Sequence, residues 1–91
     1  MSMSRGCLVV EREIDEWYCV VARDEYDYDF ENYSVYGPAK TEDAALDLMS
    51  ASECNPGSFN TITHNELTPA VAKMIDDELR AARRIMRRRY S

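Results

Sequence analysis

Two apolar runs separated by a short polar stretch place the strongest constraint on how this chain can fold. Residues 7–12 and 17–23 are rich in valine and aromatic side chains, and the residues between them are largely polar. This arrangement predicts a β-hairpin. Side chains alternate between the two faces of a strand, and both sets in the second run are largely apolar: Trp17, Cys19 and Val21 against Tyr18, Val20 and Ala22. The second strand is therefore expected to be central and covered on at least one side.

Short apolar segments bounded by turn residues predict two further strands. Residues 32–36 form a third strand that ends at Gly37-Pro38, and residues 58–63 form a short fourth strand. Between the second and third strands lies the segment 24–31, which is either an acidic loop or an extended hairpin tip.

Two helices are predicted from their capping residues. Thr41 is a suitable N-cap for a first helix that runs to about Ala51. Thr68-Pro69 is a cap followed by proline at the first helical position, and apolar residues at helical spacing continue to about Arg89. The expected fold is α+β in the order β-β-β-α-β-α, with an antiparallel sheet of three to four strands and two helices packed on one face.

The length of 91 residues fits one domain over the whole chain, 1–91. We expect residues 1–6 to be disordered and residues 87–91 to form a basic tail. No apolar run reaches the length of a membrane-spanning helix, and the N-terminus lacks the apolar stretch of a secretory signal. A cytoplasmic protein without a membrane partner is therefore expected.

Three cysteines are an odd number for a secreted disulfide scaffold of this size. Cys7 and Cys19 are expected to face each other across the hairpin, in the reduced state in a cytosol. Zinc could in principle use these two thiols with Cys54 and His64, but no two of the four have the close spacing of a structural site. Buried free thiols are the simpler interpretation.

No other pattern predicts catalysis or a cofactor. Asp27, Asp29 and Glu31 resemble the opening of a calcium loop, but Asn32 replaces its glycine and Pro38 its bidentate glutamate. The sequence also lacks a serine-nucleophile motif and a glycine-rich phosphate loop. We therefore expect a protein that is not an enzyme and needs no cofactor or metal.

The acidic segment 24–31 alternates carboxylates with aromatic side chains. If it were extended, carboxylates on one face would recur every 6.6–6.8 Å or so, a spacing comparable to that of phosphates along a nucleic-acid strand. Aromatic side chains supply the rigid contact area that interfaces favour. The expected partner-binding residues are Asp24, Glu25, Tyr26, Asp27, Tyr28, Asp29 and Glu31, with Glu42, Asp43 and Asp47 adjoining. The alternative is a solvated acidic loop with a few core aromatics.

Charge is divided unevenly along the chain. Residues 1–75 carry five basic and 14 acidic side chains, whereas residues 76–91 carry six arginines and three acids. The arginine-rich end suggests a nucleic-acid-binding helix or one that binds an acidic protein. Its arginines could instead stabilise the helix by interacting with the helix dipole. They could also pair with the acidic body of the same or a neighbouring chain, as in a homodimer. The basic residues concerned are Arg83, Arg84, Arg87, Arg88 and Arg89.

Three segments carry a resemblance to a known class of proteins: residues 17–22 (WYCVVA), 35–38 (VYGP) and 40–45 (KTEDAA). Over residues 17–50 the chain resembles small accessory proteins of bacteriophages, which pair a short antiparallel sheet with a helix that opens in this way. The acidic members are similar to anti-CRISPR and other anti-defence inhibitors. The basic tail departs from a simple DNA mimic.

This resemblance, together with the acidic body, implies a non-enzymatic inhibitor that blocks a host nucleic-acid-handling, CRISPR-Cas-like complex through its acidic, aromatic-rich surface. A nucleic-acid-binding module that uses the arginine-rich helix is the first alternative. A homo-oligomeric structural or accessory protein is the second.

Overall fold

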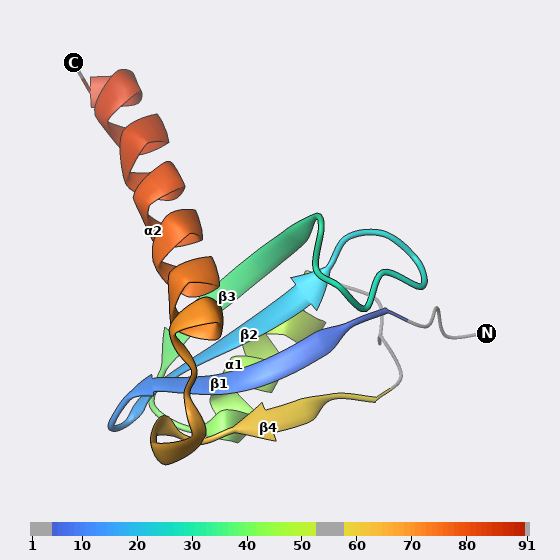
Figure 1. Ribbon diagram of the computed structural model, residues 1–91. Coiled ribbons are helices and arrows are strands. Elements are labelled where there is room, and N and C mark those ends of the chain that lie inside the picture. The colour runs from blue at the N-terminus through green and yellow to red at the C-terminus, as the bar shows by residue number, and fades with distance from the viewer. Residues whose placement is uncertain (1–4, 53–57, 91) are drawn as a thin grey trace.

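The computed structural model describes residues 5–52 and 58–90, with side chains described as far as Ala81. Four strands and two long helices follow one another in the expected order: β1 (Cys7–Glu13), β2 (Glu16–Ala22), β3 (Tyr33–Ala39), α1 (Glu42–Ser50), β4 (Asn60–Ile62) and α2 (Pro69–Tyr90). A short 3₁₀ helix, η1 (His64–Glu66), precedes α2 and has no counterpart in the sequence-based prediction. The α+β class and the element order are confirmed (Figure 1).

The sheet is mixed, so the expectation of a purely antiparallel sheet is wrong at one strand. Its strand order is β3-β2-β1-β4, and β4 runs parallel to β1. The cause lies in the connection through α1. A helical crossover returns the chain to the starting end of the sheet, so that β4 runs in the same direction as β3. Since β3 and β1 are both antiparallel to β2, β4 is also parallel to β1.

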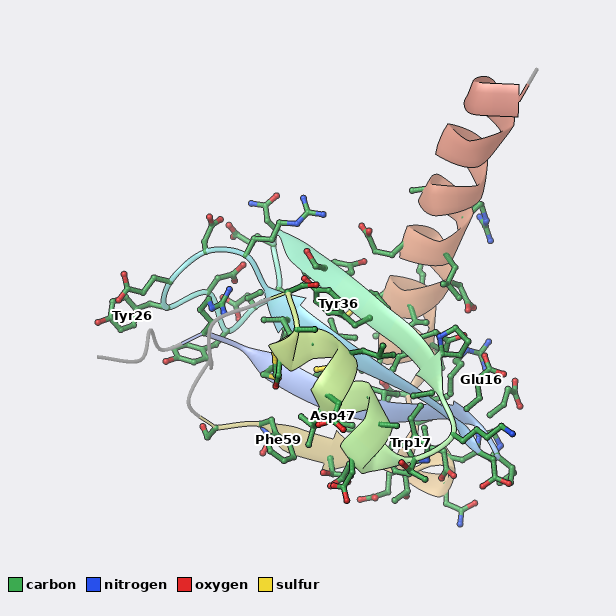
Figure 2. All side chains as sticks on the ribbon, turned by 180° about the vertical axis from the view of Figure 1, so that it is seen from behind. Glu16, Trp17, Tyr26, Tyr36, Asp47 and Phe59 are labelled. Carbon is green, nitrogen blue, oxygen red and sulfur yellow. The ribbon has the colours of Figure 1, made fainter. Side chains whose placement is uncertain are left out.

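The two helices cover opposite faces of the sheet, which corrects the prediction that both pack on one face (Figures 1 and 2). One core is closed by α1 and consists of Cys7, Val9, Cys19, Val21, Ala45 and Met49. The other is closed by α2 and consists of Val10, Tyr18, Val20 and Ile75. Both faces of β1 and β2 are apolar, so each face needs a helix to exclude water. The central position expected for β2 is confirmed.

The predicted helix starts are confirmed by their hydrogen bonds. The Thr41 hydroxyl accepts the backbone N–H of Ala44 at 3.1 Å, and the Thr68 hydroxyl accepts that of Val71 at 3.3 Å. These bonds satisfy donors that the first turn of a helix leaves without an intrahelical partner. The bond between Thr41 and Ala44 fixes where the chain leaves β3 and begins α1, which crosses one face of the sheet.

Several segment boundaries differ from expectation, and the fourth strand is shorter than predicted, spanning Asn60–Ile62. Arg5 and Gly6 are buried rather than disordered: Arg5 is 6% exposed and donates to the carbonyl of Ala22 at 3.4 Å. Residues 1–4 lie outside the described part of the chain. The third strand continues through Gly37-Pro38 to Ala39 instead of ending before it. It does so by a bulge, because the register with β2 shifts at this point.

Helix α2 is longer than the sheet is wide and projects beyond it (Figure 1). Its first half packs on the sheet through Val71, Met74, Ile75 and Leu79. The helix then continues to Tyr90, and this segment lies past the edge strand β3 in Figure 1. The molecule is consequently elongated, with extents of 43 × 30 × 23 Å.

Candidate partner-binding site

The acidic segment 24–31 is a loop that joins β2 to β3 at one end of the sheet. The extended conformation that would place its carboxylates in a row is absent, because the backbone turns at Tyr26 (φ 64°) and Phe30 (φ 55°). Non-glycine residues in this left-handed region mark turns rather than strands. The phosphate-like row of carboxylates is therefore wrong as a description of this surface, although the loop still concentrates acids and aromatics.

One carboxylate holds the loop together. Asp27 accepts the backbone N–H groups of Asp29 at 3.1 Å, Glu31 at 3.0 Å and Asn32 at 3.3 Å. Its own carbonyl accepts the N–H of Gly6 at 3.0 Å, which ties the loop to the start of β1. A carboxylate that caps three backbone donors is a local structural element. Asp27 therefore shapes the binding surface and is only half exposed on it.

The aromatic residues of the loop divide into two groups. Phe30 packs against the core beneath α2, whereas Tyr26 is 68% exposed and Tyr28 is 57% exposed. Tyr28 also lines a cavity of about 140 Å³ together with Phe59, which precedes β4 and is 42% exposed. Figure 2 shows Tyr26 at the tip of the loop, apart from Phe59. Of the two exposed tyrosines, Tyr28 thus shares a cavity with Phe59, a residue that sequence reasoning did not select.

The carboxylates nearest these tyrosines are exposed. They are Asp24, Glu25, Asp29 and Glu31. Asp24 also accepts the side-chain amide of Asn32 at 3.2 Å, which closes the base of the loop. The structure therefore brings together most of the expected surface: two exposed tyrosines surrounded by four carboxylates. We call this surface, residues 24–31 with Phe59, the acidic–aromatic surface.

Glu42 and Asp43 do not adjoin this surface, which corrects the prediction. They begin α1, and α1 follows the far end of β3, whereas the 24–31 loop precedes the near end of that strand. A seven-residue strand separates the two positions by roughly 20 Å. Glu42 instead accepts the Thr61 hydroxyl at 3.0 Å and so links α1 to β4. Asp47, farther along α1, is exposed on the face seen in Figure 2.

The arginine-rich end of α2 is helical to Tyr90. The side chains of Arg83, Arg84, Arg87, Arg88 and Arg89 lie outside the described residues, so only their place along the helix is known. The predicted helical form of this segment agrees with the structure, and its binding role stays a prediction.

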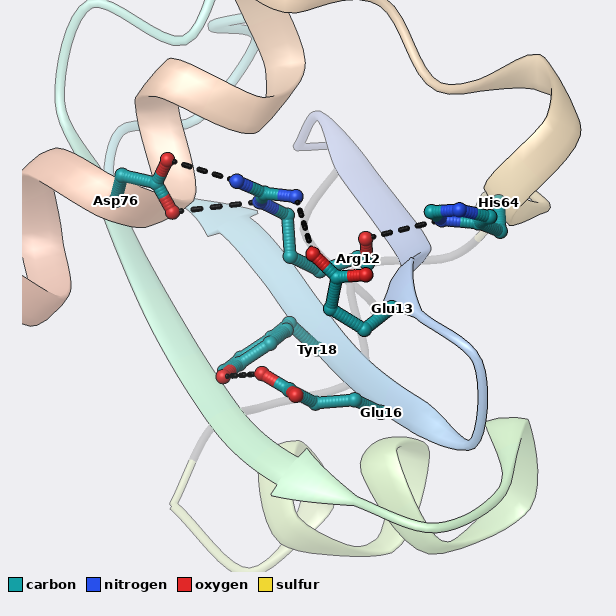
Figure 3. Close-up of polar contacts among 6 residues, drawn as sticks. All are labelled: Arg12, Glu13, Glu16, Tyr18, His64 and Asp76. Carbon is teal, nitrogen blue, oxygen red and sulfur yellow. Dashed lines mark hydrogen bonds and ion pairs between the residues drawn. The ribbon is translucent and has the colours of Figure 1, made fainter.

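A polar cluster at the opposite end of the sheet joins β1 to α2 and η1 (Figure 3). The Arg12 guanidinium donates to both carboxylate oxygens of Asp76, at 3.3 and 3.1 Å, and to Glu13 at 3.0 Å. The bond to Asp76 raises the pKa of Arg12. The Nδ1 atom of His64 lies 3.1 Å from the carbonyl oxygen of Arg12. The contacts of Arg12 with Asp76 and with His64 join separate segments of the fold, so we interpret the cluster as structural.

Tyr18 belongs to the same region and carries a pH-dependent prediction. Burial raises the pKa of its hydroxyl to about 12, and the hydrogen bond to Glu16 at 2.5 Å adds to the rise. An unfolded tyrosine ionises near pH 10 or so. The contribution of Tyr18 to stability is therefore complete below about pH 10 and is lost as the pH rises through about 12, by about 3 kcal/mol in all. Denaturant unfolding at about pH 9 and about pH 11 should show about half of this loss, because the rest occurs above about pH 11.

The matched variants are Tyr18→Phe and Tyr26→Phe. Tyr18 is 2% exposed, so its replacement should flatten the alkaline fall in stability, while replacement of the exposed Tyr26 should leave the fall unchanged. Burial also raises the pKa of Tyr33, so some alkaline dependence should persist in Tyr18→Phe. An unaltered slope in Tyr18→Phe would show that this hydroxyl is solvated.

Two thiols lie in contact beneath α1. The Sγ atoms of Cys7 and Cys19 are 3.8 Å apart, and both residues are buried and free. Their mutual hydrogen bond raises the pKa of Cys19, and burial raises it further. The same bond, together with the nearby Arg5, lowers the pKa of Cys7. Of the other two zinc candidates, Cys54 lies outside the described residues. His64 contacts Arg12, at the end of β1 opposite to Cys7.

Within residues 5–52 and 58–90, the structure contains no group of three or more His, Cys, Asp or Glu side chains that could hold a metal ion. None of the helices in this described part has the length and apolarity needed to cross a membrane. Comparison with known proteins gives no relative: the chain matches no protein-family model, no curated protein and no solved structure.

Proposed function

We propose that this chain is a non-enzymatic binding protein that docks its acidic–aromatic surface on a basic surface of a partner protein. The observation that carries the proposal is the exposure of Tyr26 and Tyr28 on a loop that Asp27 holds in one conformation. Rigid aromatic side chains are frequent binding hot spots. A pre-ordered loop also loses less conformational entropy when it binds.

The charge around the tyrosines indicates the kind of partner. Four exposed carboxylates surround them, and the chain as a whole carries a net charge of −6. Such a field speeds association with a basic surface and slows association with nucleic acid itself. Surfaces that hold nucleic acid are strongly positive. Together with the resemblance to phage accessory proteins, this favours an inhibitor that occupies the nucleic-acid groove of a CRISPR-Cas-like complex in the host cytoplasm.

The direct test uses purified CRISPR effector complexes and measures their binding to target DNA with and without this protein. We expect the parent protein to reduce DNA binding and the Tyr26→Ala/Tyr28→Ala variant to bind the effector at least about tenfold more weakly. Glu25→Lys/Asp29→Lys should slow association and reduce its dependence on salt. Asp27 is left intact because its removal would disorder the loop.

The matched control is Glu13→Lys/Asp43→Lys, which changes the net charge by the same amount at exposed positions at the opposite end of the sheet. It should inhibit as the parent does. Equal loss of inhibition in the control and in Glu25→Lys/Asp29→Lys would mean that overall charge, rather than this surface, determines binding. If neither the parent nor the control binds the effector, the protein is not an inhibitor of the CRISPR type.

A further inference from the structure

An open groove of about 600 Å³ lies at the end of the sheet opposite the acidic–aromatic surface. It is bounded by the β1–β2 turn, the end of β3 and the middle of α2. Its apolar wall includes Ile14, Pro38, Ala39 and Leu79. Ile14 is 69% exposed, the largest exposed fraction among the large hydrophobic side chains of the described residues. Ile14 is therefore part of a continuous apolar wall rather than a single exposed hydrophobic residue.

The groove is also acidic along one side. Asp15 and Glu16 line it, and Lys40 is the basic residue among its lining side chains. Glu13 adjoins the same turn. An occupant with an apolar stripe and basic residues would therefore match the groove in both respects.

The end of α2 has this composition. Residues 82–90 contain five arginines and no acid, and Ala82, Ile85 and Met86 continue the helical spacing of Ile75 and Leu79. The sheet covers Ile75 and Leu79, but the helix and its apolar spacing continue beyond the edge of the sheet (Figure 1). The segment cannot enter its own groove, because α2 is one continuous helix that leads away from it.

We infer that two copies of this chain associate through these elements, each placing the end of its α2 in the groove of the other. Leu79 both lines the groove and marks where the helix begins to leave the core. The segment beyond it is about 16 Å long. If two such segments lie antiparallel with Leu79 opposite Met86, the tip of each passes Leu79 of the other copy by about one helical turn. The contact is then symmetric and closed, as a two-fold dimer requires.

The charge distribution within α2 supports the same arrangement. Asp77 and Glu78 precede the arginines by about one helical repeat. Setting Leu79 opposite Met86 of the second copy places Glu78 opposite Arg87 and Asp77 opposite Arg88. A parallel arrangement would instead place arginine opposite arginine. This dimer leaves the acidic–aromatic surface free, so it does not depend on the proposed function.

The test measures the mass of the full-length protein by sedimentation equilibrium at low salt. The groove variant is Ile14→Lys/Asp77→Lys/Glu78→Lys, which reverses the acids set opposite the tail, and the tail variant is Arg87→Glu/Arg88→Glu. We expect the parent to be a dimer, each variant alone to be a monomer, and an equimolar mixture of the two to be a dimer again. In the mixture, the native tail meets the native groove, and the reversed tail meets the reversed groove.

The control Arg23→Glu reverses an exposed cation that lies outside both the groove and α2, and this variant should remain a dimer. Circular dichroism establishes that each variant is folded. A monomeric parent, or a mixture that stays monomeric while its components are folded, overturns the inference. A monomeric parent whose binding to a short DNA duplex is abolished in the tail variant would overturn it in favour of a nucleic-acid-binding helix.

Discussion

Ile75→Ala is expected to lower the free energy of unfolding by roughly 2–5 kcal/mol. Ile75 is 0% exposed and is among the largest fully buried side chains of the described residues. It packs against Val10, Tyr18 and Val20, and it is the fully buried residue by which α2 contacts the sheet. Its truncation leaves a cavity between a helix and a sheet that other elements hold in place, so the gap cannot close completely.

The total stability of a small domain is only about 5–15 kcal/mol, so this loss is a large share of it. Each kcal/mol lowers the melting temperature of a domain of this size by about 4–8 °C. Thermal unfolding followed by circular dichroism should therefore show a fall of at least about 10 °C. The loss for Leu79→Ala should be smaller, because Leu79 is only partly buried and borders the open groove.

Ile14→Ala is the matched control, since it removes the same atoms from an exposed site. Measured in dilute solution, where self-association does not contribute, it should change stability by less than about 0.5 kcal/mol. Equal effects of the two substitutions would mean that α2 does not pack on the sheet through Ile75. In that case the second core would have to be closed by another element.

Local sequence signals were sufficient for the four strands and for helices α1 and α2. Thr41 and Thr68-Pro69 mark the helix starts because capping depends on residues within one turn of the chain. The apolar runs of β1 and β2 likewise predict the hairpin and the central place of β2. In each case the deciding interactions lie within a few residues, or across a tight turn.

Long-range arrangement was harder to predict. The sequence shows that both faces of β1 and β2 are apolar, yet it does not state which helix covers which face. That choice depends on the crossover through α1, which carries the chain from one edge of the sheet to the other and makes β4 parallel. The prediction for Glu42 and Asp43 was wrong for a related reason. Their separation from the acidic loop depends on the length and direction of β3, which lies between them.

The acidic loop shows a second limit. Alternation of acids and aromatics in residues 24–31 left open whether the segment is a loop or an extended hairpin tip, and only the extended form would place its carboxylates in a row. The loop forms instead because the Asp27 side chain competes for the backbone N–H groups that a strand would pair with its neighbour. Such a carboxylate cannot be told from its neighbours by residue type alone. Phe59 and the groove at Ile14 depend on contacts between distant segments and left no sequence signal.

Gly37→Ala is expected to destabilise the fold by roughly 2–4 kcal/mol. Gly37 has a φ of 138°, a conformation that side-chain-bearing residues rarely adopt. A Cβ at this position would also lie 2.7 Å from the backbone carbonyl oxygen of Trp17 and 2.8 Å from the ring of Tyr18. The first of these atoms belongs to the central strand and cannot move without disturbing the sheet.

The cause is the bulge in β3. Trp17 pairs with Ala39 and Cys19 with Tyr36, so Gly37 and Pro38 together lie opposite Tyr18 alone. The extra residue lets the edge strand continue to the start of α1, and it brings the backbone of β3 close to β2. An alanine would force the two strands apart where Tyr18 and Glu16 meet and where Pro38 and Ala39 line the groove.

Chemical denaturation of Gly37→Ala measures the effect on stability, with Ser34→Ala as the control on the same strand. Ser34 accepts a hydrogen bond from Arg23 at an exposed position, so its loss should cost less than about 1 kcal/mol. The Gly37 variant should also self-associate more weakly than the control, because the groove wall moves with the bulge. A Gly37→Ala protein that unfolds at the same denaturant concentration as Ser34→Ala would show that β3 has no bulge at this position, and that the groove is shaped by other residues.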